Sequence, residues 1–354
     1  MTRTDLPAPS QCPVSRQNLD QSHARIRQAI GRPEFGLFGP DSVMWKVTSP
    51  TPVVPLMLME AGLLEAPHPV IAFGTLDSQS ATDFIPRYHR SADAFYDWFF
   101  GDLDTALKTA RRIFGYHSRI SGELPIDIGG LPQGRHYDAN EQDVLIWVWA
   151  TLIRPLKEYY EIFESPLPKS AVERYYQECK LFALLFGIDD TLLPRDWQEF
   201  IDYFDTFANS SALDLSEEFL SRSTVLSGEV VGPLSVTVPT TWVLSICASR
   251  LPTHVRRQYP RLPTARRHRM VAAATCAVAS VVWPRLPRAV RTTPRIMDAY
   301  RRIGLRGPEG FLGRSIQAKL PPPYGMSYRQ AGISPHGNRI RQAVGSEGSA
   351  LSTA

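Results

Sequence analysis

The chain has 354 residues, of which 43% are hydrophobic and 21% are charged, and its formal net charge at pH 7 is +4. This length allows one large domain or two ordinary ones, and the composition excludes collagen-like and disulfide-rich proteins. The four cysteines (Cys12, Cys179, Cys247 and Cys276) are scattered and form no CxxC pair, which favours a reducing compartment.

The charges are distributed unevenly along the chain. Residues 245–341 hold 19 Lys or Arg and only two acids, whereas residues 1–244 hold 20 basic and 32 acidic residues. A basic segment is most often solvated surface, and the alternative is a weak contact with an anionic surface or partner. Specific nucleic-acid binding is not expected, because few aromatic residues interleave with the basic ones.

The N-terminus lacks the apolar core of a signal peptide. The longest apolar run, from Val271 to Trp283, is shorter than the roughly 20 residues that span a bilayer. We therefore expect a cytoplasmic protein, with peripheral membrane association as the alternative.

Helical periodicity dominates the first third of the chain. Residues 1–18 are predicted to be a disordered lead-in, followed by a helix from about Asp20 to Ile30. Residues 41–47 fit either a short strand or one helical turn. Val53–Leu64 predicts a buried helix that breaks near Pro67-His68-Pro69.

The next two predicted helices carry the candidate site. A helix from Thr82 to Phe100 places Arg87 and Ser91 on the same face as a set of aromatic residues: Phe84, Tyr88, Phe95, Trp98 and Phe99. Asp102 is the expected N-cap of the second helix. Its apolar stripe, which runs through Leu103, Ala106, Leu107, Ala110, Ile113 and Phe114, ends in His117, and the helix is expected to stop at Gly122.

The remaining elements follow the same period. A loop over Gly122–Gly134 precedes the predicted helices, whose approximate ranges are 140–163 with a kink at Pro155, 170–186 with a capping box, 196–207, 216–226, 240–250, 266–282 and 294–303. Val230–Val238 is a brief extended candidate. The fold class is therefore all-α, with one domain over residues 19–303 and a mostly disordered tail over 304–354.

Local motifs leave the chemistry open. The chain has none of the spacings typical of zinc sites, P-loops, dinucleotide-binding folds or serine hydrolases. A lone inward histidine such as His117 is more often a satisfied core residue than a ligand. An inward arginine such as Arg87 needs an anionic partner, and the commonest one is an acid of the same chain.

Taken together, the order and spacing of several segments resemble the rubber oxygenase family, to which latex-clearing protein and the MpaB-type oxygenases belong. The resemblance covers about residues 35–303. Its central block is Phe99-Phe100-Gly101-Asp102, Ala110-Arg111-Arg112-Ile113 and His117-Ser118-Arg119-Ile120-Ser121-Gly122. Further matching segments are 63–69, 87–91, 137–139, 145–151 and 173–178.

The resemblance implies an all-α domain that holds one heme b, with His117 as the axial iron ligand. Arg87 and Ser91 match the family's R-x-x-x-T motif near the heme and are the candidate catalytic residues. His68 is a further candidate in the same shell, with core packing as the alternative. The expected reaction is oxygenation, with O₂, of an apolar and isoprenoid-like small molecule.

Three positions depart from the family pattern. Ser91 replaces the usual Thr, Trp149 replaces a frequent His, and Arg90 stands where latex-clearing protein has a lysine that can reach the distal iron position. Because arginine stays protonated, Arg90 predicts an open or water-occupied distal site. The departures keep two alternatives open. One is a non-catalytic helical protein that binds an anionic surface through its basic C-terminal third; the other is a metal carrier using His68, His89 and His117.

Overall fold

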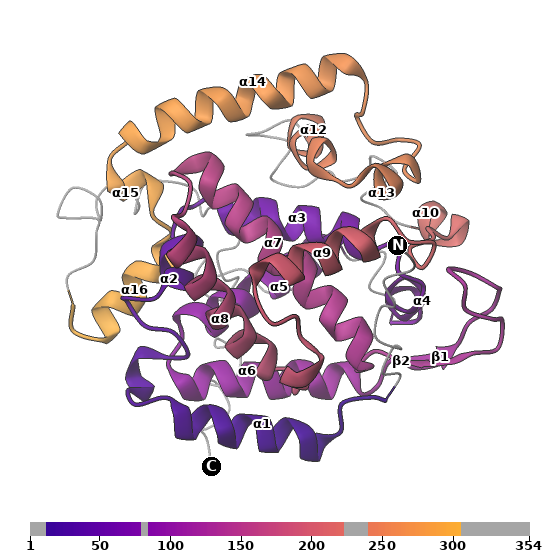
Figure 1. The fold of residues 1–354 in the computed structure, drawn as a ribbon, viewed down its shortest axis with the longest axis horizontal. Helices are drawn as coiled ribbons and strands as arrows, with labels where there is room; N and C mark the ends of the chain where they lie inside the picture. Colours follow the sequence, from indigo (N-terminus) through magenta and orange to yellow (C-terminus); the bar gives the residue numbers. More distant parts are fainter. Residues whose placement is uncertain (1–11, 79–83, 223–239, 306–354) are drawn as a thin grey trace, which may run out of the picture.

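The computed structural model describes residues 12–78, 84–222 and 240–305. This part of the chain forms one helical domain (Figure 1), which confirms the predicted all-α class. The α-helices are α1 (Arg16–Ala29), α2 (Val43–Thr48), α3 (Val53–Glu65), α4 (Pro69–Asp77), α5 (Phe84–Phe100), α6 (Leu103–His117), α7 (Gln142–Phe163), α8 (Lys169–Leu184), α9 (Trp197–Ala208), α10 (Glu217–Arg222), α12 (Thr240–Arg250), α13 (Thr253–Arg257), α14 (Arg266–Val282), α15 (Arg288–Arg291) and α16 (Pro294–Arg302). Short 3₁₀ turns are η1 (Pro33–Phe35), η2 (Asp190–Leu192) and η3 (Trp283–Arg285), and two strands, β1 (Ser121–Glu123) and β2 (His136–Asp138), pair antiparallel.

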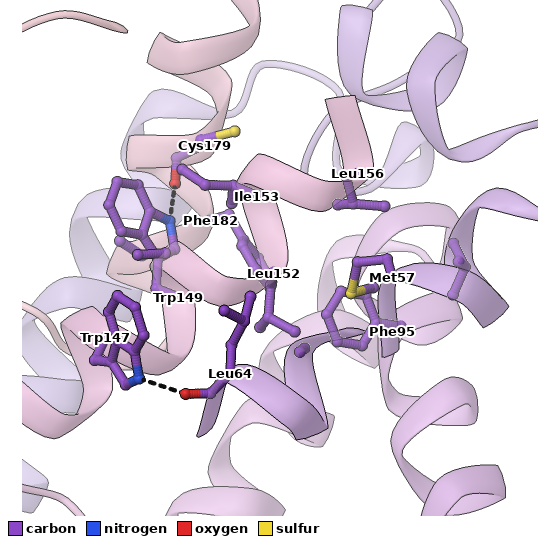
Figure 2. Packing of buried hydrophobic residues seen from close by; sticks show 14 of the residues in the cluster. Met57, Leu64, Phe95, Trp147, Trp149, Leu152, Ile153, Leu156, Cys179 and Phe182 are labelled. Atoms are coloured by element: carbon purple, nitrogen blue, oxygen red, sulfur yellow. Dashed lines mark hydrogen bonds between the residues drawn. The ribbon is translucent and has the colours of Figure 1, made fainter. Parts of the chain in front are cut away.

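The centre of the domain is the packing of α3 along α7 (Figure 1). Helix α3 is apolar on nearly all sides, as expected for a helix that is enclosed by its neighbours. Two indole N–H groups attach α7 to its neighbours. Trp147 donates to the Leu64 carbonyl of α3 at 3.2 Å, and Trp149 donates to the Cys179 carbonyl of α8 at 2.8 Å (Figure 2). Both indoles are fully buried, so these hydrogen bonds remove the cost of leaving a donor unpaired.

Helices α5 and α6 meet at a corner that the sequence specifies closely. Gly101 ends α5, and the Asp102 carboxylate accepts from the Thr105 backbone N–H at 2.7 Å, as predicted for an N-cap. Gly36, with φ +85°, packs against this corner, where a Cβ would lie 2.1 Å from the Gly101 carbonyl oxygen. Only glycine fits there, because the conformation is left-handed and the space is filled.

Several predicted boundaries are wrong. Helix α1 begins at Arg16, with Ser15 as its cap and Val14 buried, so the end of the expected 1–18 lead-in is structured. Pro69 starts helix α4 where only a break was expected, because proline is tolerated in a first turn. Helix α8 begins after Pro168 without a side-chain cap, so the predicted capping box at Ser170 does not form.

The loop after α6 contains the small β1–β2 hairpin, which the sequence did not predict because three-residue strands show no alternating pattern. Residues 41–47, for which a short strand and one helical turn were both open, contribute to helix α2, and the predicted 266–282 helix is confirmed as α14. The expected extended stretch at Val230–Val238 lies outside the described residues, as does nearly all of the 304–354 tail.

Arginines of the basic C-terminal third bind acids of the N-terminal part. Arg250 pairs with Glu158, and its Nε lies 3.5 Å from buried Glu60. Arg291 pairs with Glu164 at 2.6 Å, and Arg295 pairs with Asp93 at 2.8 Å. A share of the sequence's charge asymmetry is therefore neutralised inside the domain.

In the three described ranges, no single helix is both long and apolar enough to cross a membrane. Helices α3 and α4 reach that length and apolarity only as a pair, and they meet at a bend of 103°.

Replacing Asp102 by alanine should lower the free energy of unfolding by about 1 kcal/mol, because α6 loses its N-cap hydrogen bond. Asp104→Ala is the matched control: this acid lies in the same helical turn, but its side chain is 81% exposed and pairs with Arg27 on the surface. An exposed pair contributes less, so the control should lose less stability. Urea unfolding of both variants measures the difference, and equal losses would contradict the capping role.

Candidate active site

His117 is the last residue of α6, at the point where the buried face of that helix opens. Leu103, Ala106, Leu107 and Ala110 are buried, whereas Ile113, Phe114 and His117 are only half-buried. The helix ends at His117, five residues before the glycine that was expected to stop it, and the Ser118 backbone N–H donates to the Phe114 carbonyl at 2.9 Å. The predicted stripe is correct, and its C-terminal end has access to solvent.

The glycine at 122 has a different role. A Cβ on Gly122 would lie 2.9 Å from the Tyr137 hydroxyl and 3.2 Å from an Asp77 carboxylate oxygen. Tyr137 donates a hydrogen bond to Asp77, which ties strand β2 to the end of α4. Gly122 is therefore required for the hairpin to approach α4, next to the end of α6.

The His117 imidazole is neutral at physiological pH. Burial, with a smaller contribution from the nearby Arg87 guanidinium, lowers its pKa to about 4. The ring makes no hydrogen bond to any residue in the described ranges, and its contact with the Tyr116 ring has a centroid distance of 6.2 Å. A neutral imidazole with an available nitrogen is the form that binds a metal ion.

Arg87 projects from the first turns of α5 toward α3, α4 and α6. Its Nη1 donates to Thr75 Oγ1 of α4 at 3.5 Å, a long hydrogen bond. Burial lowers the pKa of Arg87, while the charge of Glu65 raises it. Among the described residues Arg87 has no ion pair within 4 Å, so the sequence-based alternative of an intramolecular salt bridge holds only as a longer-range attraction to Glu65.

Glu65, the last residue of α3, was missed by the sequence reasoning. Its Oε1 accepts from the Thr151 hydroxyl of α7 at 2.9 Å. Burial raises the pKa of Glu65 to about 7, with Arg87 and Thr151 opposing the rise. The signal was present in the sequence, because Glu60 and Glu65 are the only acids in an otherwise apolar helix.

Ser91 lies one turn after Arg87 on α5 and is half-buried, so the two residues share a helix face as predicted. Its hydroxyl makes no hydrogen bond within the described residues. The role assigned to Ser91 stays a prediction.

His68 lies in a different environment from His117. It precedes the first turn of α4, is 7% exposed, and stacks on Phe207 of α9 with ring centroids 6.1 Å apart. Burial lowers the pKa of His68 to about 4, and the cation that adds to this effect is Arg135, not Arg87. Its packing against an aromatic ring agrees with the core-packing alternative.

A second polar cluster lies near His68 and also escaped the sequence reasoning. Arg135 forms a two-pronged ion pair with buried Glu141, at 3.2 and 2.6 Å. Burial and the Glu141 charge raise the pKa of Asp143 to about 6. Arg135 directly precedes β2, and Glu141 and Asp143 lie at the start of α7, so this cluster holds the β2–α7 corner in place.

The other two departures from the family pattern have clear structural outcomes. Trp149 is a core residue that packs against Tyr176 and Phe200, with ring centroids 6.1 and 5.4 Å away. Arg90 is exposed and acts on Arg87 as a like charge that lowers its pKa. Trp149 thus serves core packing, and its indole N–H donates to the Cys179 carbonyl.

The structure gives no support to the metal-carrier alternative. In the described part of the chain, no three His, Cys, Asp or Glu side chains come close enough together to hold a metal ion. The proposed set of His68, His89 and His117 is therefore not a ligand cluster.

A surface hollow of about 490 Å³ lies between α1 and α6. Its lining residues are Arg16, Leu19, Asp20, Arg111, Phe114, Gly115 and Ser118. None of the candidate residues at 68, 87, 91 and 117 lines it, although Phe114 and Ser118, which flank His117 on α6 and just after it, do.

Replacing Glu65 by glutamine should flatten the pH dependence of stability. The pKa of the Glu65 carboxyl is 4.5 when the group is exposed, as in the unfolded chain, and about 7 in the folded protein. Its contribution to the free energy of unfolding is therefore fully present below pH 4.5 and is lost as the pH rises through 7, by up to about 3 kcal/mol. Glutamine stays neutral throughout, so this loss should disappear.

Chemical denaturation at pH 5, 6, 7 and 8 measures the effect, and the exposed strand variant Glu123→Gln is the control. An unchanged slope in Glu65→Gln would show that this carboxyl does not titrate in that window.

The family comparison covers both helices of the site. The model of the catalytic domain of the ER-bound oxygenases mpaB and mpaB′ and of rubber oxygenase matches residues 45–281, about two thirds of the chain. No curated protein and no solved structure matches the chain. The match begins in α2, ends in α14 and includes the candidate residues at 68, 87, 91 and 117. This chain therefore belongs to the mpaB and rubber oxygenase catalytic-domain family, a family of oxygenases, and is an oxidoreductase.

Proposed function

We propose that the protein is a heme b-dependent oxygenase that acts with O₂ on an apolar, isoprenoid-like small molecule. The observation that carries the proposal is the electrostatic influence of the Arg87 guanidinium on His117, whose pKa it helps to lower, in a member of this oxygenase family. Thirty residues and a helix corner separate the two side chains in the sequence.

His117 fits the role of axial ligand on its own chemistry. Iron binds the neutral imidazole, and burial together with Arg87 keeps this imidazole neutral at physiological pH. Its ring is not tied to another described side chain, so no hydrogen bond has to break for ligation. Heme, when bound, would supply the activation of O₂.

Arg87 fits the role of a cation facing an anionic group in the site. Its long bond to Thr75 and its distant attraction to Glu65 leave the guanidinium only partly satisfied. A carboxylate of the cofactor, or negative charge that develops on oxygen, would complete its hydrogen bonding. Ser91, one turn further along the same face, would add a hydroxyl donor.

An apolar substrate suits the surroundings of His117. Ile113 and Phe114 lie about one helical turn before it, are half-buried and pack against the core. Apolar walls with few polar groups bind apolar molecules and exclude water from the reacting atoms. In this proposal His68, which stacks on Phe207, is a packing residue of the core. A position beside the cofactor is the less favoured assignment for it.

His117→Ala should lose at least about tenfold in affinity for hemin, because the axial bond is removed. The measurement is the Soret absorbance per chain after supply of hemin and removal of the excess. The control is His136→Ala, a histidine on the exposed face of β2. A wild-type protein without a Soret band, or a His117→Ala variant with full heme content, would overturn the proposal.

Arg87→Met should reduce substrate-dependent O₂ uptake by roughly tenfold or more, because a charged hydrogen bond is lost. Arg87→Lys keeps the charge without the planar fork and should recover part of the rate. An oxygen electrode with an apolar polyene as substrate measures both, at equal heme content. Full activity in Arg87→Met would rule out a role for this cation in the reaction.

A further inference from the structure

Helix α14 presents an apolar face that nothing in the described structure covers. It lies along one edge of the molecule, outside α12 and α7 (Figure 1). Met270 is 63% exposed and Val278 is 61% exposed, and Val271, Val281 and Val282 are also exposed. We call these five side chains the outer face of α14.

The opposite side of the helix is the one that packs against the protein. Ala272 is buried, and the Thr275 hydroxyl accepts from the Trp242 indole N–H of α12 at 2.9 Å. Trp283, just past the end of the helix, packs edge-on against Phe163 of α7 with centroids 5.5 Å apart. Since these contacts fix the rotation of α14, its outer face points away from the domain.

The two hydroxyl groups of α14 are satisfied within the helix. Thr275 donates to the Val271 carbonyl at 2.8 Å, and Ser280 donates to the Ala277 carbonyl at 2.9 Å. The helix contains no acid. The surface between its ends is therefore apolar, and no hydroxyl donor there needs water.

Arginines flank the outer face at both ends. Arg266, Arg267 and Arg269 lie in the first turn, and Arg285 and Arg288 follow the last. Within the described residues, Arg266, Arg267 and Arg288 form no ion pair, in contrast to Arg250, Arg291 and Arg295. Unpaired cations on both sides of an apolar strip favour an occupant that is apolar in the middle and anionic at its rim.

A second copy of the chain does not meet this requirement. Two α14 helices packed antiparallel would bring Arg267 of one copy against Arg285 of the other, and parallel packing would bring like residues together. Neither arrangement offers an acid on this helix to offset the repulsion. The remainder of the chain after residue 305 is itself net basic, and residues 223–239 contain one acid, Glu229.

We propose that α14 is an interfacial helix that rests on an anionic lipid surface. The outer face would lie at the boundary between headgroups and acyl chains, and the arginine stems would reach back to the lipid phosphates. Apolar burial and attraction to anionic lipid act together in such a helix. This proposal is independent of the heme proposal, because it concerns a different surface and a different readout.

The test is cosedimentation of the full-length protein with vesicles of phosphatidylcholine, alone or mixed with phosphatidylserine, over a range of salt concentrations. Binding should be stronger to the mixed vesicles and should fall as salt rises. Val278→Glu should weaken it by at least about tenfold, since it places a charge in the apolar strip. Each of Arg267→Gln and Arg288→Gln should weaken it about fivefold.

Matched controls separate this surface from general effects. Ile126→Glu also replaces an exposed apolar residue, 48% accessible in the loop after β1, and should bind like the wild type. Lys108→Gln and Lys169→Gln remove exposed cations of other helices and should have little effect.

Three outcomes would overturn the proposal. The first is a wild-type protein that does not bind the mixed vesicles. The second is binding that the α14 variants leave unchanged. The third is a wild-type dimer, seen by sedimentation velocity, that Val278→Glu dissociates while vesicle binding is absent, which would assign the face to a second copy.

Discussion

The fold depends on the packing of α3 against α7 and on two carboxylates that this packing buries. Glu60 is 3% exposed and accepts from the Tyr159 hydroxyl of α7 at 2.5 Å. Glu65 accepts from the Thr151 hydroxyl of the same helix. Burial raises the pKa of each to about 7. A buried carboxylate is costly unless it is protonated or paired, so each must be served by a neighbouring element.

The two carboxylates connect the centre of the domain to its two ends. Glu60 faces Arg250 of α12, which also binds Glu158 and lies over the Tyr159 ring, 5.1 Å from its centroid. Glu65 attracts Arg87, which in turn acts on His117. Because both charges lie on one short helix, the position of α3 governs both the docking of the C-terminal third and the electrostatics beside His117.

The sequence predicted elements whose signals are local. Helices α7, α9 and α14 follow from periodicity, and the cap at Asp102 follows from a side chain that binds the backbone N–H three residues on. The inward direction of Arg87 and His117 also follows from helical spacing. That these two side chains lie close together could not be predicted, because it depends on how α5 and α6 cross. The contribution of Glu65 could not be predicted either, because it depends on how α3 packs beside them.

The same limit applies to surfaces. A run such as 271–283 is equally compatible with a buried helix and an exposed one, since composition does not tell which neighbours are present. The net charge of the basic C-terminal third also did not show whether its arginines are paired or exposed. In the structure they form two groups. Arg250, Arg291 and Arg295 are half-buried partners of acids, whereas those around α14 remain at the surface.

The candidate active site at His117 and the outer face of α14 lie in separate parts of the domain. Helix α14 lies along one edge of the domain in Figure 1, and helix α6, which carries His117, lies toward the opposite edge, just inside α1. Between them stand α3 and α7, whose buried interface resists small displacements because close-packed cores are stiff. A contact on α14 therefore has no short path to the imidazole, and the two surfaces are expected to respond to substitution independently. Glu60 and Arg250 provide a charged link between the two parts, since they join α3 to α12, on which α14 packs.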